Sequence, residues 1–153
     1  MQELDRADRA ILGALQEDGR MSLTDLSLKV GLSPTATTER FKRLQRDGII
    51  TGFRATLDPA KLNRDFLVYV AVLLDKTTPD IVERFNQAIR RVPEAMECHL
   101  VGGGFDYLIK ARVADMAAYR AFLGDKIWII PGVKETRTYA VMEEVKNDGP
   151  LPI

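Results

Sequence analysis

The sequence contains one cysteine and one histidine, Cys98 and His99, among 153 residues. One cysteine cannot form an intrachain disulfide, and one Cys with one His cannot supply the ligands of a zinc site. Lys and Arg together equal Asp and Glu, at 22 each, so the net positive charge typical of nucleic-acid-binding proteins is also missing. The composition predicts no metal site, and any nucleic-acid contact has to come from a local basic surface.

Long apolar runs and a signal peptide are missing as well. No stretch of about 18 apolar residues is present, so no membrane span is predicted. The first ten residues, MQELDRADRA, are charged and lack the apolar core of a secretory signal. Together with the single cysteine, these features favour a cytoplasmic protein without membrane contact.

Candidate catalytic residues are equally scarce. Cys98 and His99 are neighbours on a predicted strand, where successive side chains point to opposite faces, so they cannot form a nucleophile–base pair with each other. Glu143 and Glu144 are more typical of a solvated strand end than of a catalytic dyad. No catalytic residue is predicted, and an enzyme is the least favoured class of function.

Residues 21–50 contain the most specific pattern, two short helices joined by a glycine turn. Ser22 is an N-cap for the first helix, which ends at Gly31 because glycine accepts the left-handed conformation of a helix end. Ser33 is the N-cap of the second helix, and Pro34 takes its first position, where a missing N–H costs nothing. With a preceding helix, this pattern predicts a helix-turn-helix domain.

The outer face of the second helix is the predicted contact surface for the DNA major groove. At about 100° per residue, Thr37, Phe41 and Leu44 face the other helices, which leaves polar and basic residues outward. Arg and Lys bind guanine edges or phosphates, and Thr binds phosphate or the thymine methyl group. Arg40 lies nearer the buried stripe and is either a phosphate contact or a structural cation paired with a carboxylate such as that of Asp47. The candidate DNA-binding residues are Ser33, Pro34, Thr35, Glu39, Arg40, Lys42, Arg43 and Arg46.

The apolar pattern changes in the second half of the chain. Residues 66–74 are apolar at every position, which is typical of a strand covered on both faces. The elements that follow give the order βαββαβ, which predicts a ferredoxin-like sandwich. Its helices cover only one face of the sheet, so Leu67, Tyr69, Ala71 and Leu73 on the other face are expected to meet the sheet of a second chain.

The sequence therefore predicts an α+β protein in three parts. Residues 1–50 form the three-helix helix-turn-helix domain. Residues 51–65 form a connecting strand and linker, because turn-forming residues follow a short extended segment. Residues 66–153 form the ferredoxin-like domain, whose last strand is expected over 133–145.

A glycine-rich turn, VGGGFD, joins two central strands of the predicted C-terminal domain. Glycines let a ligand approach backbone N–H groups, which suits a carboxylate, and Asp106 can accept from an ammonium group. The turn matches neither the dinucleotide fingerprint nor a phosphate loop. It is either the pocket of a small ligand or an ordinary wide hairpin turn. The candidate effector-binding residues are Val101, Gly102, Gly103, Gly104, Phe105 and Asp106.

Several motifs resemble those of one family of regulators. They include GLSPT at 31–35, ERFKRL at 39–44, ECHLV at 97–101, FDYL at 105–108 and TRTY at 136–139. On these residues the chain resembles the leucine-responsive regulatory protein / asparagine-regulator (Lrp/AsnC, feast/famine) family of bacterial and archaeal transcription regulators. The resemblance covers nearly the whole chain.

This resemblance implies an N-terminal DNA-binding domain and a C-terminal domain for effector binding and assembly. It implies a homodimer formed through the sheet, with dimers assembling into a higher oligomer, often an octamer. It also implies an amino-acid effector, leucine being the nearest family choice, held near residues 101–106 between dimers. Many relatives carry an acidic residue at the position of Gly104, so Asp106 is the carboxylate that remains for an ammonium group.

We therefore expect an amino-acid-responsive, DNA-binding transcription regulator of amino-acid metabolism, of the leucine-responsive type, that binds double-stranded DNA and needs no cofactor. A local regulator of proline or branched-chain amino-acid catabolism is an alternative. A different class is an amino-acid sensor that acts through protein contacts, with the helical domain serving only for assembly. That role does not need Lys42, Arg43 and Arg46 exposed together, and this distinguishes the two classes.

Overall fold

The computed structural model describes residues 3–153, and Met1 and Gln2, which begin the predicted domain 1–50, lie outside the described residues. Contacts divide the chain into two compact units, which we call the helical unit and the sheet unit. None of the helices in the described part is long and apolar enough to cross a membrane.

The two units do not follow the predicted boundaries throughout. The helical unit comprises the chain up to Thr56 together with Lys146–Ile153, and the sheet unit comprises Leu57–Val145. The C-terminal tail therefore belongs with the N-terminal helices, whereas the sequence places it in the predicted domain 66–153.

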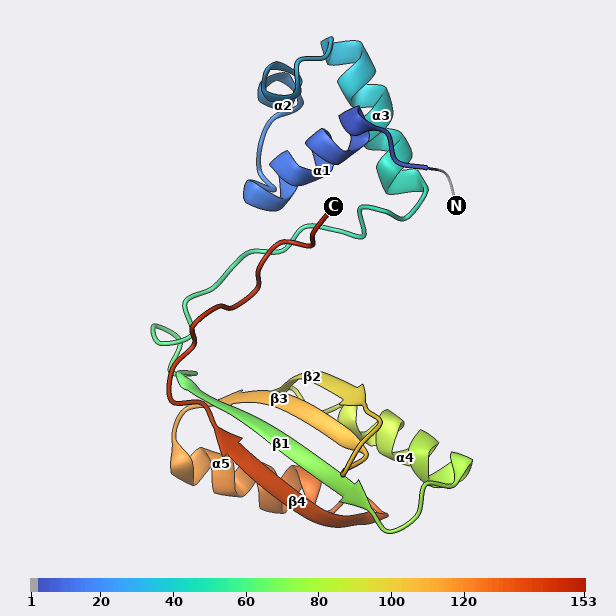
Figure 1. Cartoon of the computed structure of the whole chain (residues 1–153). Helices are drawn as coiled ribbons and strands as arrows, with labels where there is room; N and C mark the ends of the chain where they lie inside the picture. Colours follow the sequence, from blue (N-terminus) through green and yellow to red (C-terminus); the bar gives the residue numbers. More distant parts are fainter. Residues whose placement is uncertain (1–2) are drawn as a thin grey trace. The chain divides into compact units, whose positions relative to one another are not determined.

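The helical unit contains the three predicted helices, α1 (Arg6–Glu17), α2 (Leu23–Val30) and α3 (Pro34–Arg46). Figure 1 shows α1, α2 and α3 packed against one another. Their apolar stripes meet in a small core, in which Thr37 is the buried polar member contributed by α3. The buried apolar residues of this core are Ile11, Leu12, Ala14, Leu26 and Leu44.

Local capping explains where these helices begin and end. The side chain of Ser22 accepts from the N–H of Asp25 at 3.1 Å, and that of Ser33 accepts from the N–H of Ala36 at 3.2 Å. Gly31 has φ of 69°, a left-handed conformation that a side chain would strain. The caps and the glycine turn predicted from the sequence are confirmed.

The C-terminal tail is attached to α1 by one side-chain amide. The Nε2 group of Gln16 donates to the carbonyl oxygen of Leu151 at 3.1 Å, and the N–H of Leu151 donates to Gln16 Oε1 at 2.6 Å. The tail therefore docks as an extended segment, with both backbone groups of one residue satisfied. No periodicity marks this contact in the sequence.

The predicted connecting strand at the start of segment 51–65 does not form, since no described strand pairs with it. Its backbone is extended and exposed, and its main attachment is Phe53, which stacks on Phe41 of α3 with ring centroids 6.4 Å apart. A turn follows, in which the N–H of Arg64 donates to the carbonyl oxygen of Pro59 at 2.8 Å.

The sheet unit has the predicted ferredoxin-like order βαββαβ. Its four antiparallel strands lie in the order β2-β3-β1-β4, and Figure 1 shows α4 and α5 on one face. A short π-helical turn, η1, follows α5 where the sequence predicts one continuous helix. The elements are β1 (Phe66–Leu74), α4 (Pro79–Ile89), β2 (Ala95–Leu100), β3 (Tyr107–Val113), α5 (Met116–Phe122), η1 (Leu123–Ile127) and β4 (Val133–Ala140).

The helix-facing side of the sheet forms the larger core. Val68, Val70 and Val72 alternate along β1 toward the helices and are fully buried. Phe85 of α4 stacks on Tyr107 of β3 with ring centroids 4.2 Å apart. This packing fixes β3, which begins directly after the glycine-rich turn at 101–106 that joins it to β2.

The outer face of the sheet is partly covered by the chain itself. Leu67 and Ala71 are 5% and 2% exposed, so the expectation that they need a second chain is wrong for these two residues, while Tyr69 and Leu73 are half-buried. The segment after β4 continues along β1, where Val141 donates its N–H to the carbonyl oxygen of Leu67 at 3.0 Å.

The same segment corrects the predicted length of the last strand. β4 ends at Ala140, not at residue 145. Beyond it, Glu144 turns across the outer face and pairs with Arg112 of β3 at 2.5 Å. Glu144 therefore supplies the counter-ion of an arginine whose side chain is only 8% exposed.

Candidate functional site

The exposed face of α3 is a narrow stripe of four side chains. At about 100° per residue, Thr35, Glu39, Lys42 and Arg46 lie one above the other on the side opposite the core. All four are exposed, and the side chain of Arg46 is 73% exposed although it contacts Asp47 at 3.2 Å. The structure brings these predicted DNA-binding residues together.

The first turn of α3 is open to solvent. Ser33, Pro34 and Thr35 are exposed, and the N–H groups of a helix start attract anions such as phosphate. The hydroxyls of Thr37 and Thr38 donate to backbone carbonyl oxygens of the preceding turn, at 3.0 and 2.8 Å. Of the hydroxyls in this first turn, that of Thr35 faces outward with no partner in the described chain.

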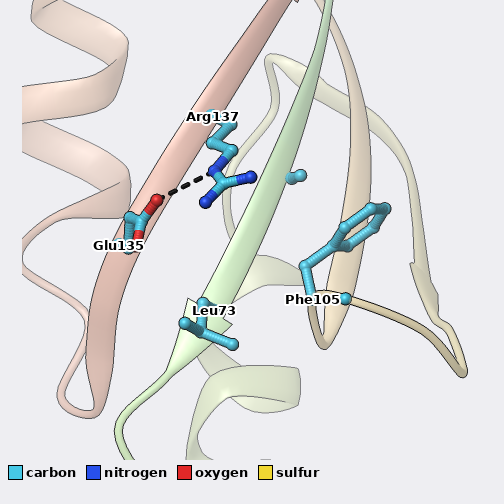
Figure 2. Close-up of a pocket in the computed structure, with 6 residues that line it drawn as sticks. Leu73, Phe105, Glu135 and Arg137 are labelled. Atoms are coloured by element: carbon cyan, nitrogen blue, oxygen red, sulfur yellow. Dashed lines mark hydrogen bonds and ion pairs between the residues drawn. The ribbon is translucent and has the colours of Figure 1, made fainter.

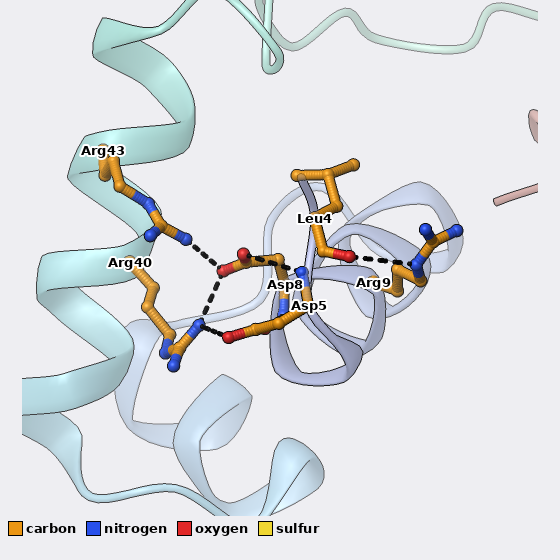
Figure 3. A network of polar contacts seen from close by, with 6 residues as sticks. All are labelled: Leu4, Asp5, Asp8, Arg9, Arg40 and Arg43. Carbon is orange, nitrogen blue, oxygen red and sulfur yellow. Dashed lines mark hydrogen bonds and ion pairs between the residues drawn. The ribbon is translucent and has the colours of Figure 1, made fainter. Parts of the chain in front are cut away.

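The remaining two candidates, Arg40 and Arg43, point toward α1 instead (Figure 3). Nη1 of Arg40 lies 2.7 Å from Oδ2 of Asp5 and 2.9 Å from Oδ1 of Asp8, while Nη2 of Arg43 lies 2.5 Å from the same Asp8 oxygen. Asp8 is only 1% exposed. A buried carboxylate is stable only when it is paired, so both guanidinium groups serve as its counter-ions.

These contacts identify the carboxylate partners of Arg40, which are Asp5 and Asp8, not Asp47. Arg43 shares the partner Asp8. The side chains of Arg40 and Arg43 are 29% and 31% exposed, and their contact with DNA stays a prediction. Two arginines and two aspartates sum to zero charge, so the net positive charge of α3 comes from Lys42 and Arg46.

The pKa values in this network follow from the hydrogen bonds. The N–H of Asp8 and then the guanidinium of Arg40 lower the pKa of Asp5, and hydrogen bonds to Asp5 and then Asp8 raise the pKa of Arg40. A lowered carboxyl pKa means that Asp5 stabilises the fold above its ordinary pKa, and that this contribution is lost as the pH falls.

Asp5 is the N-cap of α1, and its Oδ1 accepts from the N–H of Asp8 at 2.8 Å. Sequence reasoning missed the role of Asp8. The spacing of the two aspartates is that of a capping box, which is a local signal. Nothing in the spacing shows that Asp8 also reaches α3, because that contact joins residues 32 and 35 positions apart.

The second site lies at the glycine-rich turn of the sheet unit. Asp106 fixes this turn to β1: its Oδ2 accepts from the N–H of Leu74 at 2.7 Å, and its own N–H donates to the carbonyl oxygen of Val72 at 2.9 Å. The N–H of Val101 closes the turn onto the carbonyl oxygen of Asp106 at 2.9 Å. An effector ammonium group at Asp106 would have to compete with the N–H of Leu74.

Beside the turn is a shallow hollow with charged and apolar walls (Figure 2). Nε of Arg137 lies 2.9 Å from Oε1 of Glu135, and this pair raises the pKa of Arg137. The hollow holds a cavity volume of only about 20 Å³, far below the roughly 300–1,000 Å³ of ligand pockets. Its lining residues are Ala71, Leu73, Gly104, Phe105, Glu135 and Arg137.

The structure thus brings two of the six candidate effector residues, Gly104 and Phe105, to the hollow. Sequence reasoning missed Glu135 and Arg137. Arg137 belongs to the TRTY motif at 136–139, but only the pairing of β4 beside β1 shows that it meets the turn.

Sequence analysis rejected Cys98 and His99 as a catalytic pair, and the structure places them on opposite faces of the sheet, as expected. Cys98 is half-buried on the helix side, and burial raises the pKa of its thiol to about 11, which keeps it protonated at neutral pH. His99 lies on the other face and contacts Glu97 at 3.3 Å. Within residues 3–153, no group of three His, Cys, Asp or Glu side chains is arranged to hold a metal ion.

The N-terminal part of the chain is a helix-turn-helix with an exposed second helix. The ferredoxin-like unit that follows presents a positive and a negative side chain in a hollow. Together these features define a ligand-responsive DNA-binding protein. Comparisons with known families agree with this class. A winged helix-turn-helix DNA-binding family matches residues 4–51, and the Lrp/AsnC ligand binding domain matches residues 67–151.

Individual relatives extend the match over the whole chain. The leucine-responsive regulatory proteins of Klebsiella pneumoniae and Escherichia coli K12 are each 52% identical over 99% of this chain and 92% of their own length. A transcriptional regulator of Neisseria meningitidis, solved as a complex with L-Met, is 34% identical, covers 98% of this chain and 97% of its own, and superimposes with a TM-score of 0.94. This chain belongs to the Lrp/AsnC family of amino-acid-responsive transcription regulators.

We predict that Asp8→Asn destabilises the helical unit strongly. Removing one partner of a buried ion pair leaves uncompensated charge, which costs about 3–5 kcal/mol. Urea unfolding followed by helical circular dichroism measures the change. Glu17→Gln is the control, because it breaks the exposed Glu17–Lys29 pair, worth about 1 kcal/mol or less. Equal small losses in both variants would contradict the role of Asp8.

Proposed function

We propose that α3 enters the major groove of operator DNA and that the residues of its exposed stripe make the contacts. The observation that carries this proposal is the alignment of Thr35, Glu39, Lys42 and Arg46 on one exposed face, beside an open helix start. A helix-turn-helix uses this face of its second helix to contact base edges, and its N-terminal end enters deepest.

In this proposal the basic residues of α3 fall into two pairs with different roles. Lys42 and Arg46 bind phosphates or base edges. Arg40 and Arg43 hold α3 against α1 through Asp8, and each keeps about 30% of its side chain exposed for a further contact. DNA in a bacterium lies in the cytoplasm, which is the location that this function requires.

We predict that Lys42→Ala and Arg46→Ala each weaken operator binding. A lost phosphate contact lowers affinity on all sequences and reduces the salt slope by about 1, and a lost base contact costs about 1–3 kcal/mol at one position. Titration of the DNA upstream of the protein's own gene at several salt concentrations measures both the affinity and its salt slope.

Lys61→Ala is the matched control, because Lys61 is 84% exposed and belongs to the sheet unit, not to the helical unit that contains α3. Unchanged affinity and slope in both α3 variants would exclude this face as the DNA contact. Weak and equal binding to all sequences by the unmodified protein would favour a sensor that acts through protein contacts.

We propose an amino acid as effector, bound in the hollow beside the glycine-rich turn without any cofactor. The guanidinium of Arg137 binds the carboxylate, and Glu135 accepts from the ammonium group. Ala71, Leu73 and Phe105 offer an apolar wall for an aliphatic side chain. The names of the relatives point to leucine, and the Neisseria relative binds L-Met, so both are first choices.

A second copy of the chain supplies the missing wall in this proposal. The hollow of one chain is open and smaller than a typical ligand pocket. An effector held between copies then changes how they assemble, which links its binding to the spacing of the DNA-binding helices.

We predict that Arg137→Ala abolishes the effect of the amino acid on DNA binding and leaves DNA binding without effector intact. Isothermal calorimetry with leucine, methionine, isoleucine, valine and proline measures affinity, and the same panel separates a leucine regulator from a regulator of proline or branched-chain catabolism. Arg84→Ala is the control, since Arg84 is a comparably exposed arginine on α4. A normal response in Arg137→Ala would refute the assignment of this hollow.

We propose a homodimer formed through the outer face of the sheet, with dimers assembling further toward an octamer. Tyr69 and Leu73 are half-buried there, and Tyr139 of β4 is 52% exposed. The buried cations of this face are already paired, Lys110 with Glu97 at 3.1 Å and Arg112 with the carboxylate after β4, so a second sheet meets little net charge. Two-fold symmetry would present two helices to two half-sites.

We predict that Tyr139→Arg lowers the molar mass measured by light scattering, because an unpaired charge in the dimer interface is costly. Met116→Arg is the matched control. Met116 is 56% exposed but lies on α5, on the helix side of the sheet. An unmodified protein that is monomeric at micromolar concentration would refute the dimer.

A further inference from the structure

The centre of the exposed stripe on α3 is an acid. Glu39 lies one turn after Thr35 and one turn before Lys42, so it faces the same direction as the proposed DNA contacts. Among the contacts of residues 3–153, Glu39 forms no ion pair. A free carboxylate on the face that meets a polyanion needs a physical reason.

The neighbouring arginines do not neutralise this carboxylate. Arg43 is four residues after Glu39, the spacing of a helical ion pair, but its Nη2 binds Asp8 at 2.5 Å. Arg40 is bound to Asp5 and Asp8. The buried Asp8 therefore holds both guanidinium groups on the side of α1, and neither of them pairs with Glu39.

In the major groove, a carboxylate can only accept hydrogen bonds. Phosphates repel it, and so do the acceptor atoms of guanine and thymine, whereas the amino group of cytosine donates. Adenine also carries an amino group, but its neighbouring N7 atom is an acceptor that suits Asn or Gln better. Cytosine is the base edge that suits a carboxylate best.

We propose that Glu39 is a specificity-determining residue that selects cytosine at one position of each operator half-site and weakens binding to other DNA. The same negative charge that costs affinity on random sequences is offset where the amino group donates to it. Asp8 is a positioning residue for this contact, because its ion pair with Arg43 keeps that guanidinium group from pairing with Glu39. The inference rests on the proposed placement of α3 in the major groove.

Selection of bound sequences from a randomised DNA pool tests this inference with the full-length protein. Glu39→Ala and the closer isostere Glu39→Gln are compared with the unmodified protein. Glu83→Gln is the control, because it removes the same charge from the exposed surface of α4. Affinities for the selected site and for each single-base change at the assigned position are then measured at fixed salt, after circular dichroism has confirmed folding.

We expect the unmodified protein to prefer cytosine at one position of each half-site by roughly 10-fold or more. Glu39→Ala should lose that preference and bind random DNA more tightly, while Glu83→Gln keeps both properties. A base preference unchanged in Glu39→Ala and Glu39→Gln overturns the inference but leaves the DNA-binding function standing. An unmodified protein without any sequence preference contradicts the proposed function itself.

Discussion

The helical unit depends on one buried carboxylate. Asp8 is 1% exposed and is held by Arg40 and Arg43 across the interface between α1 and α3 (Figure 3). Because an unpaired charge in such a place is costly, these arginines are committed to fixing α3. The stripe that starts at Thr35 and includes Glu39 is then the face of α3 that we propose for DNA contact, so a structural ion pair sets the chemistry of the exposed face.

The sheet unit uses an acid in the same way. Asp106 has the residue type expected of an effector contact, yet it accepts from the N–H of Leu74 and fixes the glycine-rich turn to β1. The charged groups that face the hollow are Glu135 and Arg137 of β4 (Figure 2). In both units, buried or half-buried acids position backbone and helices, while neighbouring side chains form the surfaces that we propose for ligand binding.

The chain connects the two units twice. One connection is the extended linker around Leu57, and the other follows β4, whose continuation pairs Glu144 with Arg112 before the tail reaches Gln16 of α1. β4 also carries Arg137, so the strand that lines the hollow proposed for the effector continues into the segment attached to the helical unit. Coupling between effector and DNA has both covalent routes available.

The sequence by itself determined the elements and their order, because caps, the left-handed Gly31 and apolar periodicity act over a few residues. It also placed Thr35 and Lys42 outward, since the helical period depends on the backbone alone. Only the tertiary structure decided that Arg43 faces Asp8 and that Arg137 faces the turn. The Arg43–Asp8 pair joins residues 35 positions apart and is selected by the cost of burying the Asp8 carboxylate. Arg137 meets the turn because β4 pairs beside β1, and no local pattern records either arrangement.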